Sequence, residues 1–207
     1  MALTTYGGLI EAIPSWSTYS DVGDEIPDFV AWAHQEICRR LRANVMLVSG
    51  DLSISAETIA APTGFLAFKR LYLDTSPRKF IRTTSAEGAM DLSATLVTGQ
   101  YPTHVALEGA LLRFAPIFTW TGTGKALYYA EPDALVDDAD TNAVMTKYPY
   151  LYLWGALEAL HAFKEDADME RSFGQRFTDL IEDINTRDAK DTTSGPVQMQ
   201  PYAGGVV

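Results

Sequence analysis

The chain has 207 residues, of which 47% are hydrophobic, so it can bury a core in one domain or in one domain that carries a sizeable insertion. Its 27 acidic and 16 basic residues give a net charge of -11, so the chain as a whole should repel phosphate backbones and anionic lipid surfaces. Stable nucleic-acid binding is therefore disfavoured. No stretch approaches the roughly 18 apolar residues needed to span a bilayer, so no membrane segment is expected.

Two helices are predicted near the N-terminus. The first runs from about Thr5 to Ile13, with Thr4 or Thr5 as its cap, and Pro14 is expected to stop it. The second begins at "IPDF", where Pro27 suits the first turn, and its apolar residues follow the 3.6-residue period to about residue 42. Each of these helices needs a partner for its apolar side.

The middle of the chain has a different pattern. Short β-rich runs, from "VMLVSGDLSIS" to "KALYYA", are separated by Gly, Pro, Ser and Asp residues, and "SAEGAMDL" between them predicts one short helix. Glu108 and Gly109 mark a hairpin. Residues 44–131 are therefore predicted to form a compact, mainly antiparallel insertion.

Helical periodicity returns after "EPDALVDDAD". A segment from about Asn142 leads into "YPYLYLWGALEALHAF", which has one apolar stripe, and a last helix is expected over about 167–190. Small residues in the former, such as Gly155, leave room for close helix approach. The stripe of the first of these two helices consists of Leu153, Trp154, Leu157, Leu160 and Phe163, and that of the last helix of Met169, Phe173, Phe177, Leu180, Ile181 and Ile184.

The predicted fold class is α+β, with a helical bundle built from both chain ends and a mainly antiparallel β-rich insertion in the middle. The bundle is assigned to residues 1–43 and 132–190, the insertion to 44–131, and a flexible tail to 191–207. The tail is rich in Gly, Pro, Ser, Thr and Gln but has a few apolar side chains, which is typical either of a segment that orders on a partner or of a plain disordered end.

No motif for catalysis, cofactor binding or metal binding is complete. "TGTGKA" lacks the spacing and the final Ser or Thr of a phosphate loop and is expected to be a loop between strands. "DDADTN" lacks the glycine and closing glutamate of a calcium loop, and its carboxylates are better explained as helix caps. The three histidines are far apart in sequence, and Cys38 is expected to be a small core residue. We therefore predict no catalytic, cofactor-binding or metal-binding residues.

The basic residues cluster only modestly, which favours solvated helix and strand faces over phosphate binding. The two clusters are Arg39, Arg40 and Arg42, and Arg78, Lys79 and Arg82.

Taken in order, several stretches resemble one known family. They are "TTYGGLIEAIPSW", "IPDFVAWAHQEICRRLR", "APTGFLAFKRLYLD", "YPTHVALEGALLRFAP", "YYAEPDAL" and "TNAVMTKYPYLYLWGALEALHAFKED". This arrangement, over about residues 4–187, resembles the head-to-tail adaptor proteins of tailed bacteriophages, also called head-completion or neck connector proteins. The resemblance implies a structural protein of the virion, located at the head-tail junction and made in the host bacterial cytoplasm.

The resemblance also implies partners. Such proteins form a homo-oligomeric ring, commonly of twelve copies, which joins the portal protein to tail or nozzle proteins and surrounds the DNA channel. By this analogy the last helix and the tail are candidate portal contacts, through the apolar residues Met199, Tyr202, Val206 and Val207. DNA would pass through the lumen without specific binding, and an acidic lumen would let it slide.

Three tyrosines fall off the main stripe of their helix, namely Tyr148, Tyr150 and Tyr152. They are candidates for a subunit interface, because a ring subunit must offer two different surfaces to its two neighbours. Ordinary bundle core is an equal alternative for them. For the whole chain, the alternatives are another tail or tail-completion virion protein and, less favoured, a small α+β enzyme without a recognisable motif.

Overall fold

The computed structural model describes residues 3–19 and 21–193, with the side chains of 191–193 left out. The fold is α+β, as predicted. The chain divides into two compact units, which we call the helical unit (Met1–Asn44 with Tyr148–Val207) and the sheet unit (Val45–Lys147). Residues 132–147 were predicted to belong to the bundle, whereas in the structure they are part of the sheet unit.

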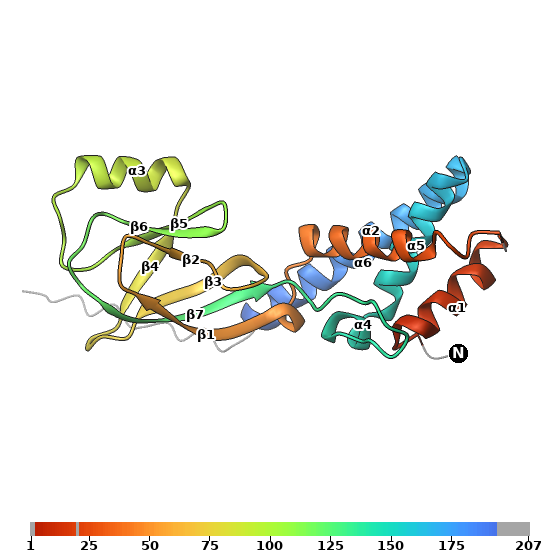
Figure 1. The fold of residues 1–207 in the computed structure, drawn as a ribbon, viewed down its shortest axis with the longest axis horizontal. Helices are drawn as coiled ribbons and strands as arrows, with labels where there is room; N and C mark the ends of the chain where they lie inside the picture. Colours follow the sequence, from red (N-terminus) through yellow and green to blue (C-terminus); the bar gives the residue numbers. More distant parts are fainter. Residues whose placement is uncertain (1–2, 20, 194–207) are drawn as a thin grey trace, which may run out of the picture. The chain divides into compact units, whose positions relative to one another are not determined.

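Within the described residues the helical unit contains four helices, two from each end of the sequence (Figure 1). They are α1 (Tyr6–Ser17), α2 (Ile26–Arg40), α5 (Pro149–Phe163) and α6 (Ala167–Thr193). The central helix is α5, since it packs against each of the other three. This explains why α5 is apolar nearly all round, whereas α6 has one apolar stripe and a solvated remainder.

α1 begins as predicted and ends later than predicted. Its cap is Thr5, whose hydroxyl oxygen accepts a hydrogen bond from the backbone N–H of Gly8 at 3.3 Å. Pro14 lies inside the helix rather than after it, so the expectation that it stops the helix is wrong. The helix continues to Ser17, and Thr18 ends it in the left-handed region with a φ of 64°. Two buried residues near this end, Ile13 and Ser17, show that the last turn is part of the packed core, which offsets the hydrogen bond lost at proline.

The helices α2 and α5 approach closely at a glycine. A Cβ atom placed on Gly155 would lie 2.8 Å from the Cβ of Ala33 and 3.3 Å from the ring of Phe177. Close approach at Gly155 was predicted, and the structure confirms it. The predicted stripe of α5 is buried at Leu153, Leu157 and Leu160, but Phe163 at its end is 56% exposed.

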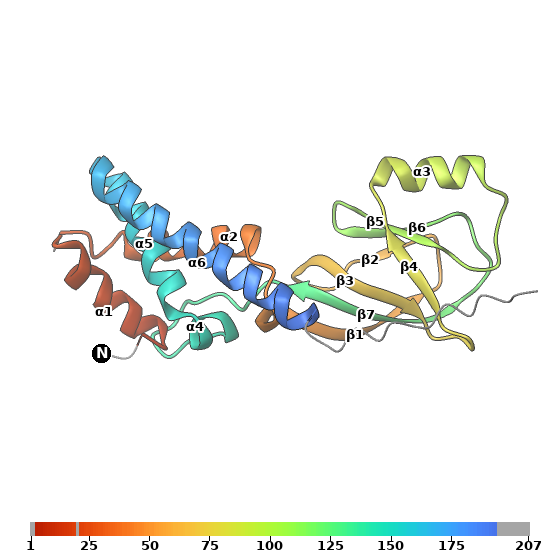
Figure 2. The ribbon, with the colours of Figure 1, turned by 180° about the vertical axis from the view of Figure 1, so that it is seen from behind.

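α6 lies alongside α5, as both views show (Figures 1 and 2). Most of its predicted stripe is buried, at Phe173, Phe177, Ile181 and Ile184, while Met169 in its first turn is exposed. The amide of Asn185 fixes the end of α2: its oxygen accepts from the N–H of Arg42 at 2.9 Å and its nitrogen donates to the carbonyl of Arg40 at 3.1 Å.

The sheet unit contains seven strands in one sheet, in the order β1-β7-β3-β4-β5-β6-β2 (Figure 1). The strands are β1 (Leu47–Ile54), β2 (Thr58–Ala60), β3 (Phe65–Leu73), β4 (Lys79–Thr83), β5 (His104–Glu108), β6 (Leu111–Ala115) and β7 (Gly122–Ala130). The remaining elements are a 3₁₀ turn η1 (Asn44–Met46), α3 (Ala86–Thr95) and α4 (Ala143–Lys147). Of the strand pairs, β4 with β5 is parallel and the others are antiparallel.

One side of the sheet is apolar, and α3 covers part of the other side. The core includes Ile54, Leu71, Leu73, Leu112 and Phe114, which are contributed by strands from all along the unit. α3 packs on β5 and β6 through small residues. The predicted hairpin is confirmed, since Glu108 pairs with Leu111 across a two-residue turn in which Gly109 has a φ of 61°.

One sequence expectation for this unit is wrong, and one strand was not predicted. "TGTGKA" is not a loop: Gly122 to Ala126 belong to β7, where they pair with residues 50–54 of β1. The short β2 was not expected, because three residues give no periodic signal and the strand exists only through its pairing with β6.

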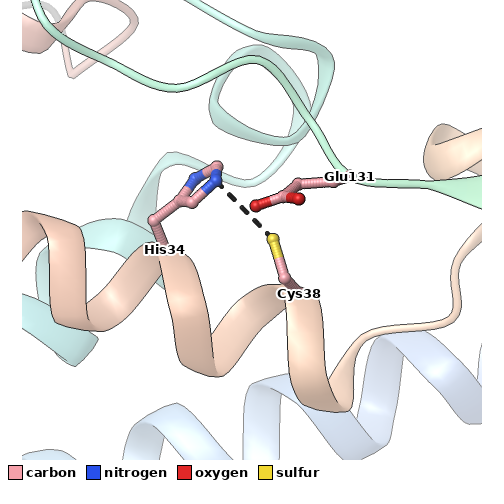
Figure 3. Close-up of side chains that lie close together, drawn as sticks. All are labelled: His34, Cys38 and Glu131. Carbon is pink, nitrogen blue, oxygen red and sulfur yellow. Dashed lines mark hydrogen bonds between the residues drawn. The ribbon is translucent and has the colours of Figure 1, made fainter. Parts of the chain in front are cut away.

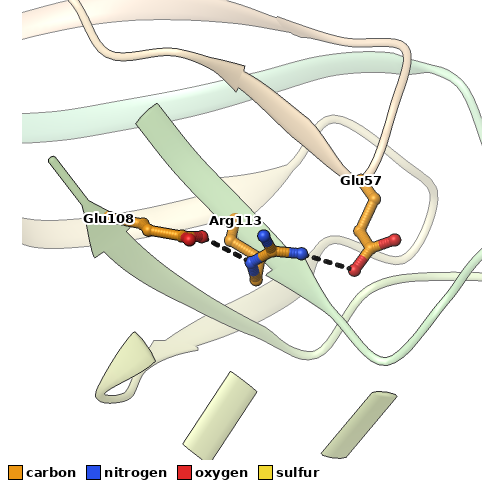
Figure 4. Close-up of polar contacts among 3 residues, drawn as sticks. All are labelled: Glu57, Glu108 and Arg113. Carbon is orange, nitrogen blue, oxygen red and sulfur yellow. Dashed lines mark hydrogen bonds and ion pairs between the residues drawn. The ribbon is translucent and has the colours of Figure 1, made fainter. Parts of the chain in front are cut away.

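Nearby, the guanidinium of Arg113 on β6 bonds the carboxylates of Glu108 at 2.6 Å and Glu57 at 3.1 Å, which ties three segments together (Figure 4).

Candidate interaction surfaces

The structure places the three histidines in different surroundings. His104 shares a hydrogen bond of 2.9 Å with the hydroxyl of the adjacent Thr103. His34 shares one of 3.0 Å with the hydroxyl of Tyr152. Its other ring nitrogen lies 3.6 Å from the sulfur of Cys38, one turn further along α2 (Figure 3). Cys38 is buried, as predicted.

The third histidine is buried between two aromatic rings. His161 stacks on Phe173 with ring centroids 5.4 Å apart and meets Tyr19 edge-on at 5.6 Å. Its Nδ1 lies 3.4 Å from a carboxylate oxygen of Asp166, and within the described residues neither ring nitrogen has a hydrogen-bond partner. A single imidazole packed in this way is part of the core rather than a member of a catalytic set.

Glu158 is the half-buried carboxylate of α5. It borders a cavity of about 380 Å³ whose other lining residues lie on α6. Burial raises the pKa of the Glu158 carboxyl, and the positive charge of Arg40 only partly opposes this effect. Within the described residues its Oε2 atom is buried without a hydrogen-bond partner. Glu170 and Thr178 also line this cavity, and the hydroxyl of Thr178 accepts a hydrogen bond from Arg40 at 3.0 Å.

Several large apolar side chains of the helical unit are exposed. We call them the exposed apolar set, and they are Trp16, Trp32, Tyr150, Phe163 and Met169. Each of the four helices contributes at least one of them. Large aromatic residues are enriched where proteins meet other proteins, so these side chains are the best candidates for contacts of the helical unit.

The three predicted interface tyrosines have different positions. Tyr152 is 0% exposed and lies in the bundle core. Its position agrees with the alternative of ordinary bundle core and not with a subunit interface. Tyr150 is 44% exposed and packs against Trp154 with ring centroids 5.6 Å apart. Tyr148 is half-buried. The tail candidates Met199, Tyr202, Val206 and Val207 lie outside the described residues.

The sheet unit has a second candidate surface, which sequence reasoning missed. Strand register places Asp51, Lys125, Tyr72 and Phe80 opposite one another across β1, β7, β3 and β4, so their side chains share one face. The alternate residues Leu71, Ile81 and Ala126 point to the core. This row therefore lies on the outer face of the sheet. A cavity of about 420 Å³ is hollowed into it over β1, β7 and β3.

This outer face is rich in arginine stacked on aromatic rings. The guanidinium of Arg78 lies 4.9 Å from the ring centroid of Tyr72, and that of Arg70 lies 5.7 Å from the centroid of Phe80. The two rings meet edge-to-face at 6.2 Å. We call Arg70, Tyr72, Arg78 and Phe80 the basic-aromatic face. The signal for it was present in the sequence as "RLY" and "RKF", but only pairing of the two strands brings them together.

A loop of opposite charge follows β7. Residues 133–140 contain four aspartates and no basic residue. The carboxylate of Asp140 accepts hydrogen bonds from the backbone N–H groups of Val136 at 2.9 Å and Asp137 at 2.8 Å, and these bonds lower its pKa. This segment is therefore a turn that is closed by the Asp140 carboxylate, and not a calcium loop. The helix cap is not a carboxylate but Asn142, whose side-chain oxygen accepts from Met145 N–H at 2.8 Å.

No helix of the described residues combines the length and the apolar composition needed to cross a bilayer. In a comparison with known families, the family model for the SU10 adaptor protein matches residues 4–200 of the chain. A search among curated proteins gives no match.

Proposed function

Because the chain belongs to the SU10 adaptor protein family, which is a family of phage head-tail adaptors, we propose that it forms a ring that joins the portal to the tail around the DNA channel. The family match over residues 4–200 carries this proposal. Family membership also gives the coarser assignment, a structural adaptor of the virion near the head-tail junction rather than an enzyme.

The helical unit supports the ring. A closed ring of identical subunits needs two different surfaces on each subunit, since each copy contacts its two neighbours through a heterologous interface. The exposed apolar set provides side chains for such surfaces on all four helices. Within it, Phe163 packs on Phe29 at 5.6 Å and Trp32 on Phe177 at 6.4 Å, so these side chains are held in place before a partner arrives.

The contacts to other proteins are assigned by the same proposal. The last helix and the tail, with Met199, Tyr202, Val206 and Val207, contact the portal, and the opposite end of the ring receives tail or nozzle proteins. Twelve copies form the ring. DNA passes through a predominantly acidic lumen, for which the helical unit is suited because it has 16 acidic and 8 basic residues.

The test is native mass spectrometry of the purified protein, alone and mixed with the portal protein encoded nearest to its gene. We expect a complex with one copy of this chain per portal subunit. A chain shortened by residues 194–207 should lose this complex, whereas Tyr150→Ser with Phe163→Ser should weaken contacts between neighbouring copies. A full-length protein that stays monomeric with the portal, but binds a tail protein, would replace the neck assignment with a tail assignment.

A further inference from the structure

The basic-aromatic face is uncovered within its own unit. The helix of this unit that packs on the sheet is α3, and it covers β5 and β6 rather than the strands that carry this face. Phe80 is 63% exposed as a result. In the part of the chain that the structure describes, neither Arg70 nor Arg78 forms an ion pair.

The chemistry of this face selects its partner. A guanidinium stacked on a ring keeps its N–H donors in the plane, where they can bind a carboxylate with two hydrogen bonds. The strand pair 65–83 has five basic residues and one acidic residue, in a chain whose total charge is -11. The preferred occupant is therefore an acidic segment with an apolar side chain that can pack on Phe80 and Tyr72.

The chain itself carries a segment of this kind. The loop 133–140 presents Val136, which is 71% exposed, beside Asp137 and Asp138, which are also exposed. Neither Asp137 nor Asp138 forms an ion pair among the described residues.

The loop is also shaped before it binds. Asp140 closes the turn at Val136, and the side chain of Asn142 donates to the carbonyl of Asp133 at 2.8 Å. A segment already held in one conformation loses less entropy on docking than a flexible one.

We propose that the acidic loop 133–140 of one copy docks on the basic-aromatic face of a neighbouring copy. Val136 packs against Phe80, while Asp137 and Asp138 pair with Arg70 and Arg78. The contact is heterologous, so each subunit gives one surface and receives the other, as a ring requires. This inference rests on the proposed ring and identifies one of its subunit contacts.

Charge reversal gives the sharpest test, with assembly on the portal measured by native mass spectrometry. The face variant is Arg70→Glu with Arg78→Glu, and the loop variant is Asp137→Lys with Asp138→Lys. Each should weaken association between copies by about ten-fold or more, and a chain that carries all four changes should recover it, because the pairs are restored with opposite sign. Glu87→Lys with Asp91→Lys on α3 is the matched control: it changes the charge by the same amount as the loop variant and should leave assembly unchanged.

A cross-linking experiment does not depend on how the strand variants fold. Phe80→Cys and Val136→Cys are made separately in a Cys38→Ser background and mixed under oxidising conditions with the portal present. We expect a disulfide dimer from the mixture and not from either variant alone.

The outcomes separate the two proposals. If the unchanged protein does not assemble with the portal, the proposed function fails. If it assembles, but the reversal variants assemble equally well and no mixed dimer forms, the loop contact is overturned while the ring stands. If the face variant instead loses binding to duplex DNA with assembly intact, the face is a nucleic-acid site and the loop contact is again overturned.

Discussion

The hydroxyl of Tyr152 lies 3.0 Å from Nδ1 of His34, which joins α5 to α2 inside the helical unit. The two rings are also stacked, with centroids 6.1 Å apart. Tyr152 is among the largest fully buried side chains of the described residues. Its polar atom is therefore used within its own subunit, although its place in the sequence made it a candidate for an interface.

Replacing Tyr152 by Phe should lower the free energy of unfolding by about 0.5–1.5 kcal/mol, because the ring still fills its site but the hydrogen bond to His34 is lost. Tyr150→Phe is the matched control on the exposed side of the same helix and should change stability by less than about 0.5 kcal/mol. Chemical denaturation of the full chain measures both. Equal effects would mean that Tyr152 does not have the buried, bonded position described above.

The contact between Gly155 and Ala33 should make α5 intolerant of a methyl group. Gly155→Ala gains about 1 kcal/mol of helix propensity, but overpacking against Ala33 costs about 1–3 kcal/mol, so the net effect should be destabilising. Thermal denaturation measures it. The double variant Ala33→Gly with Gly155→Ala moves the methyl group to the other helix and should recover much of the loss.

A second helical glycine provides the control for this experiment. A Cβ atom on Gly174 of α6 would meet the end of the Glu158 side chain at 2.8 Å, and that flexible side chain can move away. Gly174→Ala should therefore be tolerated. If Gly155→Ala proved as harmless as Gly174→Ala, the close packing of α2 and α5 would be contradicted.

Glu158 should make the stability of the helical unit depend on pH. Burial raises the pKa of its carboxyl, so the folded chain holds the proton more tightly than the unfolded chain does. Stability should then fall as the pH rises from the ordinary glutamate pKa through the raised one. At pH values above this range, Glu158→Gln should raise the unfolding temperature. At pH values well below the range, it should give no gain.

Denaturation curves of Glu158→Gln at several pH values check this sign. Glu182→Gln, on an exposed position of α6, is the control and should leave the pH dependence unchanged. A gain for Glu158→Gln that is the same at all pH values would show that the effect comes from packing and not from ionisation.

Asn142 should be the most sensitive residue near the acidic loop. Asn142→Ala removes the cap of α4 and the bond to the carbonyl of Asp133, and it should destabilise this region by about 1–2 kcal/mol. Hydrogen exchange at the Met145 amide should become faster. Thr141→Ala removes only an exposed contact with Thr146 and should change exchange little; a similar change in both variants would contradict the role given to Asn142.

The sequence by itself determined most of the local structure. The cap at Thr5, the proline start of α2, the hairpin at Gly109 and the close approach at Gly155 each depend on the residue type at one position, which the sequence states directly. The stretch "YPYLYLWGALEALHAF" was predicted to be a helix of the bundle, and α5 forms there and packs against the other three helices.

Only the tertiary structure decided which side chains meet. Pro14 stays inside α1 and Tyr152 turns to His34, because packing against other helices outweighs the local preference at those positions. The basic-aromatic face depends on the register of β3 with β4, and its cavity also depends on β7 and β1. A shift of one residue in that register would turn these side chains into the core, and register is set by the long-range pairing of the whole sheet, which no local pattern encodes.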